Sequence, residues 1–175
     1  MDVSYPSVPL YLLYCPELVR AMCRPVMKFA KMPVWHYDFA PHDVGQYPLA
    51  NGQVYGMGEK YKNKEGGEEA NQMPVEECGN MIILMSAICD AEDDVSFAKE
   101  HIDTLRQWSE YLIRYGLDPE HQLCTDDFAG HFAHNANLSV KAIVGIASYA
   151  RMAQMQGLED VAAKYLAVAR DLAAQ

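Results

Sequence analysis

Apolar residues recur every three or four positions along several stretches of the chain, which is the period of one face of an α-helix. Polar or turn-forming residues separate these stretches, which are residues 16–32, 74–92, 97–116, 135–157 and 161–172. No segment alternates apolar and polar residues over a useful strand length. The pattern therefore predicts an all-α chain.

Residues at the ends of these stretches support the predicted boundaries. Pro16 suits the first turn of a helix, where its missing N–H is not needed. Asn135 or Asn137 can cap the fourth helix with a side-chain oxygen. The second helix is expected to run out in the acidic turn 92–94, and Gly116 is expected to end the third in a left-handed conformation.

The connections between the predicted helices alternate between long and short. Helices joined by short turns run antiparallel. Antiparallel helical hairpins would then carry both long loops, residues 33–73 and 117–136, at the same end. Loops longer than about a dozen residues are usually functional or disordered. Within the first, residues 60–69 are dense in Gly, Lys and Glu and are expected to be the most mobile part of the chain.

Composition limits the partners of the chain. Its 175 residues, half of them hydrophobic, suffice for a single domain with a sizeable core. The net charge of -10 disfavours nucleic acid and anionic membranes, because binding to them depends on Lys and Arg. The longest apolar run, residues 81–89, is about half the roughly 20 residues of a membrane-spanning helix. Five cysteines without a C-x-x-C motif predict buried thiols, with no zinc site and no disulfide framework.

The first long loop carries polar residues that its turns do not require. Proline, glycine and Asn-Gly supply the turns, whereas His42, Asp43, Gln46 and Tyr47 offer hydrogen-bonding groups. One interpretation is a surface loop whose aspartate caps a turn. In the other, His42 and Asp43 point into a cleft for a small polar ligand. The aromatic walls of that cleft would be Trp35, Tyr47 and Tyr55.

Two adjacent glutamates, Glu76 and Glu77, stand in the first turn of the second predicted helix. Acidic side chains there gain roughly 0.3–1 kcal/mol from the helix dipole, which is a structural explanation for them. Neighbouring residues on a helix point about a hundred degrees apart, so one glutamate would face solvent and the other the core end. A catalytic or substrate-binding role for one of them is the alternative interpretation.

The loop before the fourth predicted helix combines acidic residues with histidines, namely Asp126, Asp127, His131 and His134. The H-x-x-H spacing lacks the glutamate of a metalloprotease motif, so hydrogen-bonding histidines are expected in place of a metal site. Cys124 has no visible means of lowering its thiol pKa, and other nucleophile or cofactor motifs are absent from the sequence. Carboxylates from three segments at one end favour general acid and base hydrolysis.

Four longer motifs are spread over essentially the whole chain. They are residues 2–6 (DVSYP), 41–52 (PHDVGQYPLANG), 73–81 (MPVEECGNM) and 123–131 (LCTDDFAGH). Together they resemble the extracellular glutaminase A family. The resemblance implies part of a six-hairpin (α/α) toroid with its site at the loop-bearing end. Family members are longer and usually exported, so residues 1–175 would be a piece of an extracellular or periplasmic parent, although the first residues lack the basic start of a signal peptide.

The family name implies an L-glutamine amidohydrolase, in which one carboxylate activates water and another acid protonates the leaving amine. The expected catalytic residues are Asp43, Glu77 and Asp127. The expected substrate-binding residues are His42, Gln46, Tyr47, Glu76, Asp126, His131 and His134. The substrate would be a small molecule, glutamine or a sugar, with neither a cofactor nor a metal. A carbohydrate-active enzyme on the same toroid and a helical binding module without turnover are the alternatives.

A closed toroid of six hairpins needs more helices than the five predicted here. The end helices are therefore expected to expose apolar stripes, to allow self-association, and to leave the piece without full activity. The expected stripes are Leu12, Val19 and Val26 at one end and Tyr165, Leu166 and Leu172 at the other.

Overall fold

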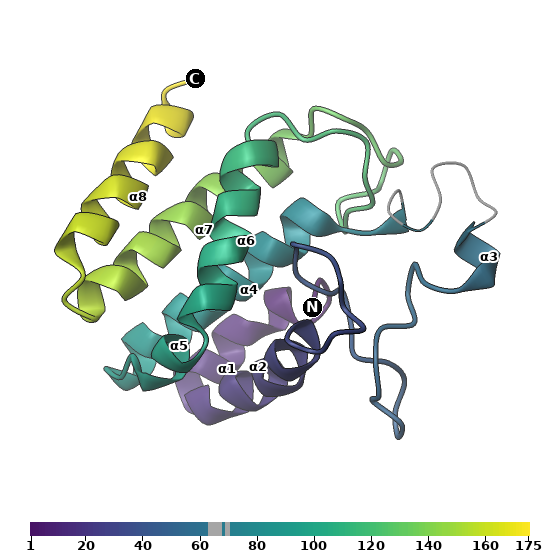
Figure 1. Ribbon diagram of the computed structural model, residues 1–175, viewed down its shortest axis with the longest axis horizontal. Helices are drawn as coiled ribbons and strands as arrows, with labels where there is room; N and C mark the ends of the chain where they lie inside the picture. Colours follow the sequence, from purple (N-terminus) through teal and green to yellow (C-terminus); the bar gives the residue numbers. More distant parts are fainter. Residues whose placement is uncertain (63–67, 69–70) are drawn as a thin grey trace.

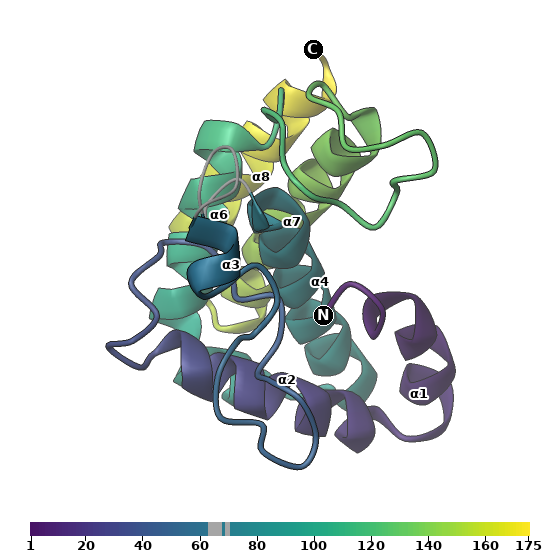
Figure 2. The same cartoon turned by 90° about the vertical axis from the view of Figure 1, so that its right-hand side faces the viewer.

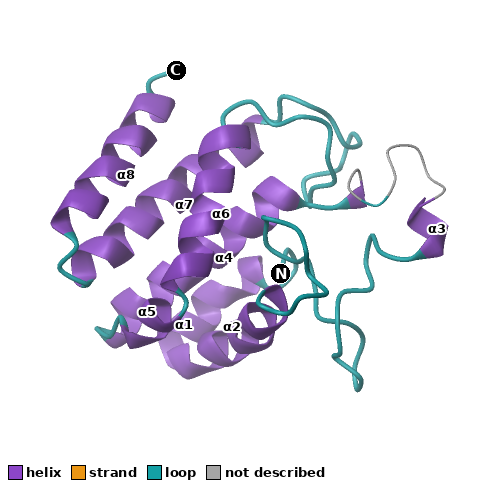
Figure 3. Cartoon of the chain, viewed as in Figure 1, coloured by secondary structure: helices purple, strands orange, loops and turns teal. Residues whose placement is uncertain are grey.

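The computed structural model describes residues 1–62, 68 and 71–175, and every regular element in that part of the chain is helical (Figures 1 and 3). The all-α prediction is confirmed. The segment 60–69, expected to be mobile, lies mostly outside the described residues. The elements in chain order are η1 (Tyr5–Ser7), α1 (Val8–Tyr14), α2 (Pro16–Ala30), α3 (Glu59–Lys62), α4 (Pro74–Glu92), α5 (Ser96–Glu100), α6 (Ile102–Tyr115), α7 (Ala136–Met155) and α8 (Glu159–Ala173).

Helix α4 lies at the centre of the molecule and packs against α1, α2, α6 and α7 (Figure 2). A helix with neighbours on every side is buried around its whole circumference rather than along one stripe. This explains why α4 buries polar as well as apolar residues along its length, and why its first turn is inaccessible to solvent. The rest of the core forms where the neighbouring helices meet it.

Helices α4 and α7 run in the same direction. The ammonium of Lys141 lies 2.8 Å from a Glu76 oxygen near their N-termini, and Arg151 Nη2 lies 2.9 Å from Asp90 near their C-termini. The loops that precede the two helices are therefore neighbours, and the Leu123 N–H donates to the Gln72 carbonyl oxygen at 3.2 Å. The prediction that α4 and α7 are parallel, with adjacent loops before them, is confirmed.

Small residues allow α7 to approach α4 and α6 closely. A Cβ on Gly145 would lie 3.4 Å from the Gly79 Cα and 2.9 Å from a Leu112 methyl carbon. Gly116 ends α6 with φ -88°, in the right-handed region, so the predicted left-handed cap is wrong. Its physical role is packing, because a Cβ there would come within 2.4 Å of the Ala142 Cβ.

One predicted helix is divided into two in the structure, and one helix of the structure was not predicted. The stretch 97–116 contains two helices, α5 and α6, because the chain leaves helical geometry at His101 while the apolar period continues. The N-terminal helix α1 was not among the predicted helices. The predicted Asn135 cap is confirmed, since its side-chain oxygen accepts from the N–H groups of Asn137 and Leu138.

The expected exposure of the end helices is confirmed for Leu166, only partial for Leu12 and Leu172, and wrong for the other three residues. Val19 and Val26 are buried against α4, and Tyr165 is buried between α8 and its neighbours, where its ring packs on Tyr149. A helix that contacts a neighbour on one side always buries one of its stripes, and periodicity alone did not identify which. The large apolar side chains exposed on α1 and α7 are Leu10, Leu13, Tyr14, Val140 and Val144. Within the described residues, no helix combines the length and apolar character of a membrane span.

Candidate functional site

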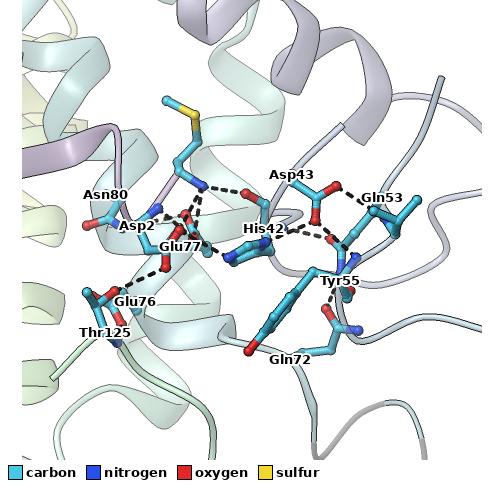
Figure 4. A network of polar contacts seen from close by, with 12 residues as sticks. Asp2, His42, Asp43, Gln53, Tyr55, Gln72, Glu76, Glu77, Asn80 and Thr125 are labelled. Atoms are coloured by element: carbon cyan, nitrogen blue, oxygen red, sulfur yellow. Dashed lines mark hydrogen bonds and ion pairs between the residues drawn. The ribbon is translucent and has the colours of Figure 1, made fainter. Parts of the chain in front are cut away.

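Three segments that are far apart in the sequence meet at the N-terminal end of α4 (Figure 4). They are the first residues of the chain, the loop that contains His42, and the loop that contains Thr125. The first turn of α4 supplies two glutamates: Glu77 binds the first residues of the chain and Glu76 binds the Thr125 loop. The His42 loop is joined to them through Asp2. The site therefore depends on the arrangement of α4, α7 and their preceding loops.

Glu77 is 0% exposed and holds the first residues of the chain in place. Its Oε1 accepts hydrogen bonds of 3.0 Å from the Met1 nitrogen and from the Asp2 N–H. Its Oε2 lies 3.5 Å from the Asn80 Nδ2 donor. Burial disfavours the charged carboxylate and raises the pKa of Glu77 to about 7. Glu77 is thus a buried acid that orients Asp2.

His42 is held between two carboxylates. Its Nε2 lies 3.0 Å from Asp2 Oδ1 and its Nδ1 lies 3.0 Å from Asp43 Oδ2, while the Tyr55 ring stacks on the imidazole. Burial opposes the charged form, but hydrogen bonds to Asp2 and Asp43 and the charge of Glu77 outweigh it and raise the pKa of His42 to about 9. The hydrogen bond from His42 in turn lowers the pKa of Asp2 to about 2. At neutral pH both members of this pair are charged.

The Asp43 carboxylate is occupied by its own loop. It accepts backbone N–H groups from Gly45 at 2.7 Å, Val54 at 3.1 Å and Tyr55 at 3.2 Å, in addition to the His42 ring. Burial would raise its pKa, but the hydrogen bonds from His42 and from this backbone lower it. The geometry therefore favours a positioning role for Asp43, which closes the loop and fixes the histidine.

Glu76 joins α7 and the second long loop to α4. One of its oxygens pairs with Lys141 at 2.8 Å, and the other accepts the Thr125 N–H at 2.8 Å. The Lys141 ammonium also lies 4.7 Å from the centre of the Tyr5 ring. The prediction that one of the two glutamates faces solvent is wrong, because Glu76 and Glu77 are both buried at the centre of the helix cluster.

A cavity of about 440 Å³ opens beside Asp2 and Glu76, and its lining does not include His42, Asp43 or Glu77. Asp2, Glu76, Asp126 and Lys141 contribute its charged groups. An apolar wall with a few convergent polar groups is the usual composition of a small-molecule site. The remaining lining comes from η1, α4, α7 and the loop before α7, and includes Tyr5, Ile83, Phe128, Val140 and Val144.

Several predicted site residues lie away from this cavity. The Asp127 side chain is 58% exposed and lies 4.0 Å from His131 Nε2, whereas His131 Nδ1 accepts the Cys124 N–H at 3.3 Å. His134 is exposed and pairs with Asp118 at 2.6 Å. Two further predicted ligand-binding residues, Gln46 and Tyr47, sit in an exposed turn, and Trp35 is a core residue.

One group of side chains has the composition of a metal site. Asp2, His42 and Glu77 each offer a ligand atom, and these atoms lie within 4.8 Å of one another. The His42 ring is oriented through its other nitrogen by Asp43, as metal-binding histidines commonly are. Here His42 Nε2 is paired with Asp2 Oδ1, and Glu77 Oε1 accepts the backbone N–H of Asp2.

Sequence reasoning missed two of the four charged residues that line the cavity, Asp2 and Lys141. Asp2 stands 40 positions before His42, so only the folded chain brings them together. Lys141 did leave a signal, because it is the one charged residue within the otherwise uncharged stretch 138–150. An isolated charge inside an apolar helix needs a partner, and here the partner is Glu76.

Comparison with known proteins gives matches over the whole chain. A family model described as the glutaminase A six helical-hairpin domain matches residues 1–175. Glutaminase A of Aspergillus oryzae is 33% identical over 176 residues, which cover 100% of this chain and 24% of that protein. A probable glutaminase of Arthroderma benhamiae is 27% identical over 217 residues, covering 91% of this chain and 24% of that protein. The chain thus spans about a quarter of these curated relatives, and no solved structure matches it.

Proposed function

The chain belongs to the glutaminase A family through its six helical-hairpin domain, and on that premise we propose that it supplies a substrate pocket for hydrolysis of the side-chain amide of L-glutamine. The observation that carries this proposal is the cavity of about 440 Å³ where Asp2, Glu76 and Asp126 meet the Lys141 ammonium. Its charges and its apolar wall suit a small amino acid.

Glutamine is a zwitterion, and the Glu76–Lys141 pair offers one charge of each sign at the cavity wall. In the proposal, Lys141 binds the α-carboxylate and Glu76 binds the α-ammonium. The two side chains exchange their mutual contact for contacts with the substrate. Asp2, kept ionised by His42, adds to the attraction for the ammonium. The methylene groups of glutamine pack on apolar residues such as Val140.

Amide hydrolysis needs a base that activates water and a proton for the departing nitrogen. We assign the base to Asp126, because a pKa of about 2 makes Asp2 a weak proton acceptor. Asp126 takes a proton from water as the water oxygen bonds to the side-chain carbonyl carbon. The same proton passes to the nitrogen as the C–N bond breaks, so ammonia leaves and glutamate remains. Asp43 and Glu77 act indirectly, by positioning His42 and Asp2.

The experiment uses the full-length protein and measures ammonia release from glutamine. Asp126→Asn should lower kcat by roughly 10²–10⁴, the usual contribution of a positioned base. Lys141→Met should act mainly by raising KM. Lys164→Met is the matched control, because Lys164 is an exposed lysine on α8 outside the cavity. Full activity of the Asp126→Asn enzyme would show that the base lies elsewhere, and Asp127→Asn tests its neighbour.

A glycosidase on the same fold is the second candidate, because paired carboxylates also serve sugar hydrolysis. The Glu76–Lys141 pair favours the amino acid, since a neutral sugar gains nothing from a fixed ammonium that must be desolvated. A panel of glycosides offered to the same protein decides between them. Reducing sugar without ammonia would replace the glutaminase proposal by the glycosidase.

A further inference from the structure

A second hollow lies between α2 and α5 and has a volume of about 530 Å³. Basic side chains line the α2 side and the residue that ends this helix: Arg20, Arg24, Lys28 and Lys31. The opposite side consists of Ser96, Phe97, Glu100 and His101. This hollow, the basic groove, shares no lining residue with the cavity of the candidate site. Its charge is opposite to that of the chain, which carries a net charge of -10.

The positive charge of the basic groove is only partly neutralised. Arg20 pairs with Glu92 and Arg24 pairs with Glu17 at 3.0 Å. In contrast, the Lys31 ammonium donates to a backbone carbonyl, that of Glu100, at 3.2 Å. For Lys28 there is no salt bridge among the described residues. Helical spacing places Lys28 four residues beyond Arg24 on the same face, so the two cations remain close together.

His101 supplies an independent indication of a ligand. It is 8% exposed, and its Nδ1 has no hydrogen-bond partner within the described part of the chain. Its ring packs edge-on against Phe97 at 5.0 Å, which fixes the imidazole at the wall of the groove. Buried polar atoms in native proteins are nearly always hydrogen-bonded. An acceptor bound in the groove would provide the missing partner once a turn of the ring brings this shielded nitrogen to the groove surface.

We propose that the basic groove binds a small oxyanion of the phosphate class. Such an ion is rich in acceptors and doubly charged near neutral pH, so it matches ammonium, guanidinium and imidazole N–H donors. Lys28 and Arg24 supply charge and His101 supplies a hydrogen bond from the wall. Sulfate, with the same shape and charge, should compete for the site.

The test measures binding of inorganic phosphate to the intact chain by calorimetry, and its effect on the melting temperature against sodium chloride of equal ionic strength. The wild type should bind phosphate saturably and melt at a higher temperature when it is bound. Lys28→Ala should weaken binding at least about fivefold, since it removes a charged hydrogen-bond donor. Lys164→Ala, a lysine outside the groove, should bind as the wild type does.

The His101→Phe variant distinguishes a loss of phosphate binding from a loss of folded structure. Phenylalanine keeps a ring against Phe97 and removes the unpartnered nitrogen, so the variant should fold with an unchanged melting temperature in chloride while it binds phosphate more weakly. The inference is overturned if phosphate gives no saturable signal, or if Lys28→Ala and His101→Phe both bind like the wild type. Glutamine turnover by the full-length protein should be unchanged in both variants, so failure here is distinct from failure of the proposed function.

Discussion

Asp43 shows how a carboxylate can hold the residues of a candidate site in place without lining its cavity. Its oxygens accept three backbone N–H groups of its own loop and one ring N–H of His42. Two segments of the loop, around residues 45 and 54, are thereby joined at one side chain. The residue controls the geometry of the site through the backbone.

We therefore expect Asp43→Asn to destabilise the protein. An asparagine presents an NH₂ group where the carboxylate accepted hydrogen bonds, so at least one backbone N–H loses its partner. Such a loss costs about 1–3 kcal/mol. Urea unfolding measures it, with the exposed Asp127→Asn as the control expected to change stability by less than about 0.5 kcal/mol. Equal stabilities for the two variants would contradict this role.

The charged network also predicts how stability depends on pH. The pKa of His42 is raised to about 9, so its contribution is complete below its ordinary pKa of 6.5 and is lost as the pH rises through 9. The pKa of Glu77 is raised to about 7, so its contribution is present below 4.5 and is lost as the pH rises through 7. The pKa of Asp2 is lowered to about 2, so its contribution to stability is present above its ordinary pKa of 3.8 and is lost only as the pH falls through 2. The free energy of unfolding should therefore fall between about pH 5 and pH 9.

The expected fall is at most about 7 kcal/mol, because the pKa values of His42 and Glu77 each lie about 2.5 above their ordinary values and each pKa unit corresponds to about 1.4 kcal/mol. Urea titrations at several pH values measure it. In His42→Asn the part of the fall between about pH 7 and 9 should disappear. A wild-type stability that rises over this range would exclude the assigned charge states.

At the scale of single residues, the sequence predicted which segments come together better than it predicted which side chains line the cavity. The motifs contain His42, Glu76 and Asp126, which belong to segments that meet near the N-terminal end of α4. They did not distinguish a carboxylate that faces the cavity, such as Asp126, from one occupied by backbone, such as Asp43. That difference depends on how the loop folds, which a local pattern does not encode.

Among the elements, the contact between α6 and α7 depends on a residue without a side chain. Gly116 has right-handed backbone geometry that alanine would tolerate, but a Cβ there would lie 2.4 Å from the Ala142 Cβ. Gly116→Ala should thus destabilise the protein by about 1–3 kcal/mol through overpacking. Adding Ala142→Gly should recover part of the loss, because it removes one of two close contacts, while the other, with the Leu112 carbonyl oxygen at 2.5 Å, remains. Thermal unfolding of the single and double variants tests this, and a stabilised Gly116→Ala protein would refute it.

Long helices with a strong apolar period were predictable because the period and the residues at the helix ends indicated the same boundaries. Helices α2, α4 and α7 start and end close to the predicted positions. The break between α5 and α6 was not predictable, since the apolar spacing passes through His101 without interruption. The choice of buried stripe on α2 also failed, because it depends on the position of α4 and not on α2 itself.

For the whole molecule, exposed apolar side chains favour self-association, mainly through residues of α1 that were not among those first expected. Leu10, Leu13 and Tyr14 are exposed together on α1. Several such side chains on one helix are typical of an interaction surface. We expect concentration-dependent dimers in light scattering after size-exclusion chromatography, and fewer in Leu13→Glu. A monomer at all concentrations, or a variant that associates like the wild type, would contradict this expectation.

The cysteines differ in burial, so their rates of alkylation report how the structure opens. Cys15 is exposed, whereas Cys23, Cys78 and Cys89 are buried in the helix core. Burial raises the pKa of the Cys23 and Cys78 thiols, so neither forms the reactive thiolate while the fold is closed. An alkylating reagent should therefore modify Cys15 at once and the buried thiols only when the structure opens. The Cys78 sulfur accepts the Ala40 N–H at 3.3 Å, and Ala40 belongs to the first long loop. The rate at which Cys78 is alkylated should therefore measure how often this loop separates from α4.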